Sequence, residues 1–251
     1  MFETGANQWR KFDHWPPKST QKATFYLHEK GRLSSEAPNG KDVFDEFVSD
    51  PHKPVPTSER ISFVMPQAYM TDDMRYASGR PDVLTYQTGV LEKDLTLAGP
   101  MTAEIHVATS GTDSDWIVKI IDVFPNELPK DFAFATKGKE MRGYQMHVRS
   151  EIIRGRYRNS FEKPEPFIPN EVAKITLTLQ DVLHTFKKGH RVMVQVHSTW
   201  FPLADRNPQK YVPNIFFANE DDFIVTTQRV YRSAERSSQI RVGVLPSPAK
   251  E

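Results

Sequence analysis

The sequence has 251 residues, of which 38% are hydrophobic, so it is long and apolar enough to build a sizeable core. It carries 33 Lys and Arg against 32 Asp and Glu, and the resulting net charge of +1 gives no reason to expect nucleic acid or an anionic membrane as a partner. The absence of cysteine excludes disulfides, thiolate metal sites and cysteine nucleophiles. No apolar run approaches the roughly 18 residues that a membrane-spanning helix needs, so we expect a soluble protein, whether cytoplasmic, periplasmic or secreted.

Alternation of apolar and polar residues runs through most of the chain and predicts half-buried antiparallel strands. In chain order, the predicted strands span residues 24–28, 83–88, 94–98, 101–109, 116–124, 174–179, 191–197, 223–230 and 239–245. The run 116–124 is apolar almost throughout, which is typical of a central strand covered on both faces. The side chains predicted to form the core are Ile105, Val107, Val118, Ile120, Leu177, Val192, Val194 and Val196.

The segments between these strands are rich in proline, glycine and polar residues. The Gly99-Pro100 pair separates two predicted strands, and residues 38–58 and 198–213 lack periodicity and are predicted to be long loops. Short helical turns are expected near residues 71–76 and 181–186. Together these elements predict an all-β fold, an antiparallel two-sheet jelly-roll sandwich like the galactose-binding domains, with long loops and few short helices.

Sequence motifs of the common catalytic and nucleotide-binding sites are absent, including G-x-S-x-G, the P-loop, H-E-x-x-H and G-x-G-x-x-G. The histidines are scattered. His190 and His197 lie an odd number of positions apart along one predicted strand, so they face opposite sides and cannot share a metal. His14, beside Asp13, fits a turn before two prolines better than it fits a catalytic triad. We therefore expect no cofactor.

Two aspartates precede the central apolar strand at alternating positions. Asp113 and Asp115 are the weak candidates for a metal site, because carboxylate oxygens are ligands for calcium. Calcium needs further oxygen ligands that the sequence does not indicate, so we favour a polar turn in which the carboxylates bind local backbone amides, and we predict no metal. Basic residues cluster nearby at 149–158, and Glu162 and Glu165 follow them, which favours an ordinary ion-pair network.

The loop at 198–213 contains the candidate site. Two large aromatic residues, which a solvated loop does not favour, are followed there by a short polar run. The predicted domain-docking or pocket-wall residues are Trp200, Phe201, Asp205, Arg206 and Asn207. In a second interpretation the aromatic residues only close one end of the sandwich. Aromatic side chains near loops also keep open an alternative function, that of an independent carbohydrate-binding module.

Several long segments resemble one family of enzymes, and they occur in the family's order. They span residues 3–10, 15–17, 80–86, 113–125, 143–146, 154–162 and 189–209, and they include the runs Asp113-Ser114-Asp115-Trp116 and Arg154-Gly155-Arg156-Tyr157. On these motifs the chain resembles the X-Pro dipeptidyl-peptidase C-terminal domain of the CocE/NonD serine hydrolases. Within that family it is most similar to the α-amino acid ester hydrolases and glutaryl-cephalosporin acylases.

The resemblance implies a jelly-roll C-terminal domain at residues 18–251 and, at residues 1–17, the exit segment of an upstream α/β-hydrolase domain. In the family, that upstream domain carries the catalytic Ser, Asp and His, and none of the three has a counterpart in this sequence. The resemblance therefore implies a non-catalytic domain that walls the active site, supports assembly and is inactive alone. Its implied partner is the missing hydrolase domain, and assembly into a homo-oligomer is left open.

Overall fold

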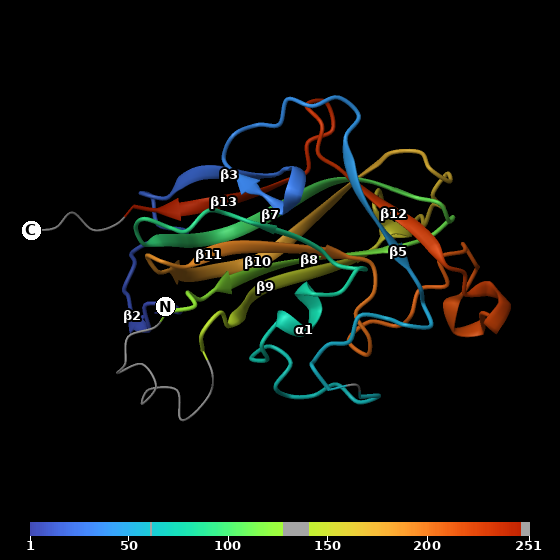
Figure 1. Cartoon of the computed structure of the whole chain (residues 1–251), viewed down its shortest axis with the longest axis horizontal. Helices are drawn as coiled ribbons and strands as arrows, with labels where there is room; N and C mark the ends of the chain where they lie inside the picture. The colour runs from blue at the N-terminus through green and yellow to red at the C-terminus, as the bar shows by residue number, and fades with distance from the viewer. Residues whose placement is uncertain (61, 128–140, 247–251) are drawn as a thin grey trace, which may run out of the picture.

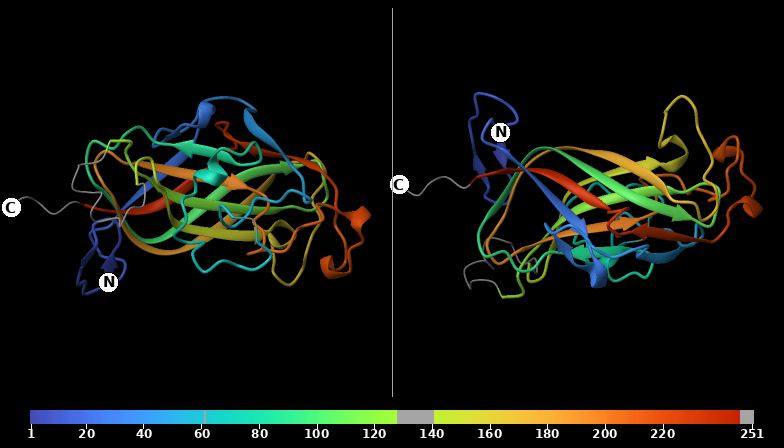
Figure 2. Two further views of the ribbon diagram at one scale, coloured as in Figure 1. Left: turned by 60° about the horizontal axis from the view of Figure 1, so that its bottom comes forward. Right: turned by 90° about the horizontal axis from the view of Figure 1, so that it is seen from above.

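The computed structural model describes residues 1–60, 62–127 and 141–246. Two antiparallel sheets pack face to face, and a small hairpin of β1 (Phe2–Glu3) and β2 (Gln8–Trp9) lies at one end of them (Figures 1 and 2). Loops carry the few short helical turns. The predicted all-β two-sheet sandwich is confirmed.

The larger sheet, called here the seven-stranded sheet, is organised around its longest strand. Its order is β4-β3-β13-β7-β12-β5. Strands β13 and β12 pair with successive parts of one edge of β7, and β10 pairs with its other edge. The strands are β3 (Gln21–Leu27), β4 (Leu33–Ser34), β5 (Phe44–Ser49), β7 (Leu95–Thr109), β10 (Ala173–Phe186), β12 (Thr226–Tyr231) and β13 (Gln239–Leu245).

The smaller sheet, the four-stranded sheet, has the order β6-β11-β8-β9. Its strands are β6 (Leu84–Gln87), β8 (Asp115–Val123), β9 (Gln145–Arg154) and β11 (Arg191–His197). Its inner face meets the seven-stranded sheet. Its outer face is covered partly by the segment leading into α1 (Arg75–Ser78), since Met74 packs there against Ile121 and Met193 (Figure 1). Strand β8 is thus buried on both faces, as its continuous apolar run predicts.

The core between the sheets contains all eight side chains that the alternation places inward. None of them is more than 2% exposed, and all belong to one apolar cluster. In β10, Lys174, Thr176 and Thr178 are exposed, whereas Ile175 and Leu177 between them are buried. Period-two patterning therefore located the core correctly, because each strand has one face turned to the opposite sheet.

Two expectations about β7 and β10 are wrong, for the same reason. Gly99-Pro100 does not separate two strands but lies within the continuous strand β7. Opposite it, β10 shifts register between Leu179 and Val182, so that residues 181–186 are strand and not a helical turn. A bulge of this kind lets a proline without an N–H stay in the sheet, and Gly99 takes the positive φ of 97° that the bend requires.

Other boundaries also differ from the prediction. The predicted loop at 38–58 contains the edge strand β5, and β9 was not predicted at all. The short helix expected at 71–76 lies slightly later, at Arg75–Ser78. The 3-10 turns are η1 (Glu29–Gly31), η2 (Gly155–Tyr157), η3 (Ile215–Phe217) and η4 (Glu220–Asp222).

Candidate functional site

Residues 198–213, called here the Trp200 loop, leave the end of β11 and are held by backbone hydrogen bonds. The Phe201 N–H donates to the carbonyl of Val55, and the Thr57 N–H donates to the carbonyl of Phe201, each at 3.0 Å. The Val55 N–H in turn donates to the Thr199 hydroxyl at 2.9 Å. The loop is therefore ordered by pairing with residues 55–57, far away in the sequence.

Trp200 is buried, with 2% of its surface exposed, and lies on the outer face of the four-stranded sheet. Its ring stands edge-on to those of His147 and His197, with centroids 6.0 and 6.2 Å away. The Nζ atom of Lys119 lies 4.0 Å from the centre of the indole. A ring covered in this way is not a surface on which a sugar could stack, so Trp200 gives no support to the carbohydrate-binding alternative.

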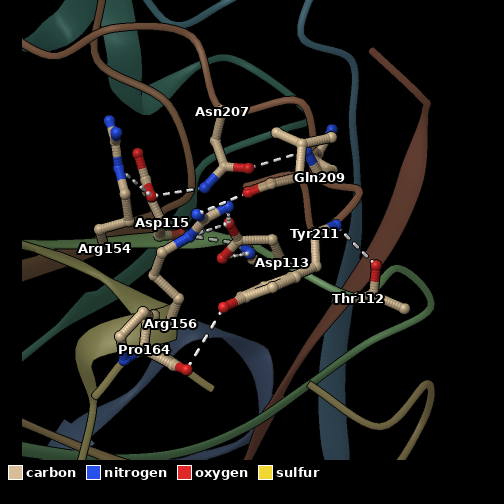
Figure 3. A network of polar contacts seen from close by, with 12 residues as sticks. Thr112, Asp113, Asp115, Arg154, Arg156, Pro164, Asn207, Gln209 and Tyr211 are labelled. Carbon is tan, nitrogen blue, oxygen red and sulfur yellow. Dashed lines mark hydrogen bonds and ion pairs between the residues drawn. The ribbon is translucent and has the colours of Figure 1, made fainter. Parts of the chain in front are cut away.

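The two aspartates at the start of β8 are bound by arginines (Figure 3). Asp113 is fully buried, and its Oδ2 accepts hydrogen bonds from Nε and Nη2 of Arg156 at 2.7 and 2.5 Å. Oδ1 of Asp115 accepts one from Nδ2 of Asn207 at 2.7 Å and lies 3.4 Å from Nε of Arg154. Two arginines of the basic cluster at 149–158, Arg154 and Arg156, thus pair with these aspartates, and Arg158 lies 4.0 Å from the expected partner Glu165.

Burial dominates the electrostatics of this network. It raises the pKa of the Asp113 carboxyl, against the opposing effect of the Arg156 guanidinium. It raises the pKa of Asp115 to about 6, although Arg154 and Asn207 favour the ionised form. Carboxylate oxygens bound to arginine are poor calcium ligands. Among the described residues, no three His, Cys, Asp or Glu side chains are grouped so as to hold a metal.

Asn207 and Gln209 extend the network into the Trp200 loop. Asn207 is 1% exposed, and its Oδ1 accepts a hydrogen bond from the Gln209 N–H at 2.7 Å. The Gln209 amide donates to the carbonyls of Ser49 and Ile224 at 3.0 and 2.9 Å. Asn207, predicted as a docking residue, is therefore buried, where it links Asp115 of β8 to the Trp200 loop, and is not part of an accessible surface.

The accessible part of the loop is smaller than predicted. The Asp205 side chain is 57% exposed and lies 4.0 Å from Arg154. Arg206 is half-buried, with its guanidinium 4.7 Å from the ring centre of Phe223. Half-buried Phe201 lines a cavity of about 440 Å³ whose other lining residues are His52, Lys53, Pro54, Pro56, Ser62 and Arg80. Phe201, Asp205 and Arg206 thus remain available to a neighbouring domain.

A second buried polar system joins the N-terminal hairpin to the sandwich. The Thr4 hydroxyl lies 2.8 Å from Nδ1 of His184, whose Nε2 lies 3.2 Å from Oδ2 of Asp122. Oδ1 of the same aspartate lies 2.8 Å from Nδ1 of His190. The order hydroxyl, imidazole, carboxylate resembles a catalytic triad. However, the Thr4 hydroxyl can also donate a hydrogen bond to the Leu183 carbonyl, 3.2 Å away, and the Thr4 backbone pairs with β10.

This arrangement therefore fastens the hairpin to β10. The Glu3 carboxylate adds to it by accepting hydrogen bonds from the Thr185 hydroxyl and from Arg10. The period-two pattern did not indicate this system, because His184 lies beyond the bulge in β10, where the pattern breaks off. His190 and His197 lie apart, as their odd spacing predicts, since His190 contacts Asp122 and His197 faces Trp200.

Large apolar side chains are exposed on the hairpin and on several loops. They include Met1, Phe2, Trp9, Phe63, Val64, Met70, Phe161, Phe216 and Phe217. The hairpin and the loop carrying η3 and η4 lie at opposite ends of the molecule (Figures 1 and 2). None of the helices in the described part of the chain is long and apolar enough to cross a membrane.

Comparison with known proteins identifies relatives over nearly the whole chain. The cocaine esterase of Rhodococcus sp. (strain MB1 Bresler) is 28% identical over 256 residues, which cover 98% of this chain and 41% of the esterase. The similar solved structures include an aminopeptidase from a marine sediment archaeon, Thaumarchaeota archaeon (42% identity, TM-score 0.90), and an α-amino acid ester hydrolase (43% identity, TM-score 0.89). They cover 98% and 97% of this chain and 40% of each relative, so the chain spans about two fifths of their length.

These matches confirm the resemblance to the CocE/NonD hydrolases. A CocE/NonD hydrolase from Staphylococcus aureus shares the fold at 13% identity and a TM-score of 0.62, over 98% of this chain and 40% of its own. The family model that describes the X-Pro dipeptidyl-peptidase C-terminal non-catalytic domain matches residues 1–241. The chain therefore belongs to the family of X-Pro dipeptidyl-peptidase C-terminal non-catalytic domains.

Proposed function

We propose that this chain is the accessory domain of a CocE/NonD-type serine hydrolase, in which an α/β-hydrolase domain preceding residue 1 performs the chemistry. The relatives are named as esterase, aminopeptidase and amino acid ester hydrolase. The substrates of the whole enzyme are accordingly esters or amides, with α-amino acid esters, β-lactam amides and X-Pro peptides as the classes to test. The accessory domain walls the active site and supports assembly.

The observation that carries this proposal is the construction of residues 1–17. One side of the hairpin is fastened to β10 by the buried contacts of Glu3 and Thr4. The other side exposes Phe2 and Trp9, which is 80% exposed, as an edge-on aromatic pair with ring centroids 5.4 Å apart. A segment held firmly on one side and apolar on the other suits a connector between two packed domains. Residues 18–251 then form the accessory domain proper.

The Trp200 loop supplies the second contact in this proposal. Its buried anchors, Trp200 and Asn207, fix the backbone, and Phe201, Asp205 and Arg206 present one aromatic and two charged side chains to a neighbour. An ordered loop with an apolar base and a charged tip suits a domain interface or the wall of a pocket.

The test uses the enzyme that contains the hydrolase domain. We expect Asp205→Ala and Arg206→Ala to lower kcat/KM or change the oligomer size of the full-length enzyme, while the thermal midpoint of the isolated chain stays the same. Glu92→Ala, at an exposed position away from the loop, is the matched control. Wild-type kcat/KM and oligomer size for both loop variants would refute the docking role.

A further inference from the structure

A layer of polar side chains lies buried on the outer face of the four-stranded sheet, beneath Trp200. Lys119 of β8 is the direct cross-strand partner of Gln195 on β11. His197 lies diagonally on one side of Lys119, opposite residue 117, and His147 lies on the other, opposite residue 121. We call these four residues the Lys119 layer. His147 is 8% exposed and the other three are fully buried.

Lys119 has no negative partner in this layer. Among the described residues its Nζ atom has no hydrogen-bond partner, and its close contact is with the face of the Trp200 ring. Burial alone lowers the pKa of Lys119 to about 7, without any effect from a carboxylate. Lysines are almost never fully buried unless paired, because an uncompensated buried ammonium costs several kcal/mol. Lys119 therefore either loses its proton or, when protonated, requires a counter-charge.

Other polar atoms of the layer also lack partners among the described residues. They are Oε1 of Gln195, Nε2 of His197 and both ring nitrogens of His147. Nδ1 of His197 lies 2.7 Å from the carbonyl oxygen of Thr199, so Nδ1 carries the hydrogen and Nε2 is an acceptor in the neutral ring. His147 carries at least one N–H in any state. Buried polar groups are normally paired with protein, water or an ion, so these unpartnered atoms mark the layer as a candidate binding site.

We propose that the Lys119 layer binds a small monovalent inorganic anion of halide size. The ammonium of Lys119 and an N–H of His147 are its donors, and Trp200 covers it. A water molecule would accept hydrogen bonds from Lys119 and His147 but leave the charge of Lys119 uncompensated, whereas an anion accepts these hydrogen bonds and compensates the charge. Oε1 of Gln195 and Nε2 of His197 are acceptors, so they bind the remaining N–H groups of the ammonium and not the anion. A monatomic anion is compact, and the flexible stem of Lys119 allows the ammonium to adjust its position to one.

The test compares the thermal midpoint of the 251-residue chain in sodium chloride and in sodium gluconate at equal ionic strength. We expect chloride to raise the midpoint, because it binds the folded state alone. Lys119→Met should abolish the difference, and Lys22→Met, at an exposed lysine, should preserve it. Equal midpoints of the wild-type chain in the two salts, or a difference that persists in Lys119→Met, would overturn the proposal and assign the layer to water.

The chloride effect should also depend on pH, since the anion requires the protonated amine. It should decrease as the pH rises above the Lys119 pKa of about 7. The other titratable or charged groups acting on this layer are His147, His197, Tyr76, Arg80 and Arg149. Crystals grown in sodium bromide provide an independent measurement, in which we expect an anomalous peak beside Nζ of Lys119. A map without that peak would overturn the proposal even if Lys119→Met failed to fold.

Discussion

Asp113 and Arg156 form a buried ion pair, and the cost of breaking it follows from what each partner leaves behind. Asp113→Ala leaves the guanidinium of Arg156, 5% exposed, without its carboxylate. We expect a loss of about 3–5 kcal/mol in the free energy of unfolding, because an uncompensated buried charge is costly. Urea titration measures this loss.

The matched control is an exposed ion pair. Asp42 lies 3.4 Å from Arg236 with 82% of its side chain exposed, so Asp42→Ala should change the stability by less than about 1 kcal/mol. Similar losses for the two variants would show that the burial of the Asp113–Arg156 pair does not determine its contribution.

Lys119 should make the stability depend on pH in a defined window. Its pKa is about 7 in the folded chain against an ordinary value of 10.5, so between these two the unfolded chain binds more protons. The stability should therefore rise as the pH increases from 7 towards 10. Lys119→Met should remove this dependence and, in chloride-free buffer at pH 7, stabilise the chain by about 1–4 kcal/mol. Urea titrations of the wild-type chain and the variant at pH 7 and pH 9 measure this change in stability. If the free energy of unfolding of Lys119→Met rose with pH as much as that of the wild-type chain, the pH dependence could not be assigned to Lys119.

At the scale of single elements, β10 gives the sharpest test of the sandwich. Leu177 is buried in the core and neighbouring Thr178 points to solvent. Leu177→Ala should cost about 2–4 kcal/mol through lost burial and a cavity. Thr178→Ala should stay within about 0.5 kcal/mol, because surface substitutions rarely do more. Chemical denaturation of both variants measures the two losses in the free energy of unfolding. A larger loss for Thr178→Ala than for Leu177→Ala would show that the inner and outer faces of β10 are the reverse of those described.

Alternation predicted the strands that have one inner and one outer face and a regular register. Residues 174–179 and 191–197 are examples, because the opposite sheet selects every second side chain. The prediction broke down where the register shifts. After the bulge in β10, consecutive residues are buried, and residues 181–186 therefore looked helical. Strand β9 contains a similar shift opposite Ile120 and Ile121, and its half-exposed charged residues hide the period.

The candidate site was predictable only in part, for a different physical reason. The sequence indicated an ordered loop with aromatic residues, and the loop is ordered. It could not indicate that Trp200 covers Lys119 or that Asn207 binds Asp115, because these contacts join residues about 80 to 90 positions apart. Contacts of that range are set by sheet topology, which local patterns do not contain.

For the molecule as a whole, we expect the isolated chain not to hydrolyse activated esters, amino acid esters or X-Pro amides above background. Acyl transfer needs a positioned nucleophile, a base and an oxyanion hole, and the family model that matches this chain describes a non-catalytic domain. Spectrophotometric assays of the purified chain measure this. Turnover that a serine-directed phosphonate abolishes, with the label mapped to this chain, would contradict it, as would turnover lost in Thr4→Val.

The position of β13 has a consequence for how the protein is made. This strand comes much later in the sequence than β3 and β7, yet it lies between them in the sheet. Until residues 239–245 have emerged from the ribosome, β3 and β7 therefore lack a neighbour and present unpaired strand edges. Such edges favour association with other chains, and contacts over more than 130 residues slow folding. Chaperones would therefore be needed most in the interval between the synthesis of β7 and that of β13.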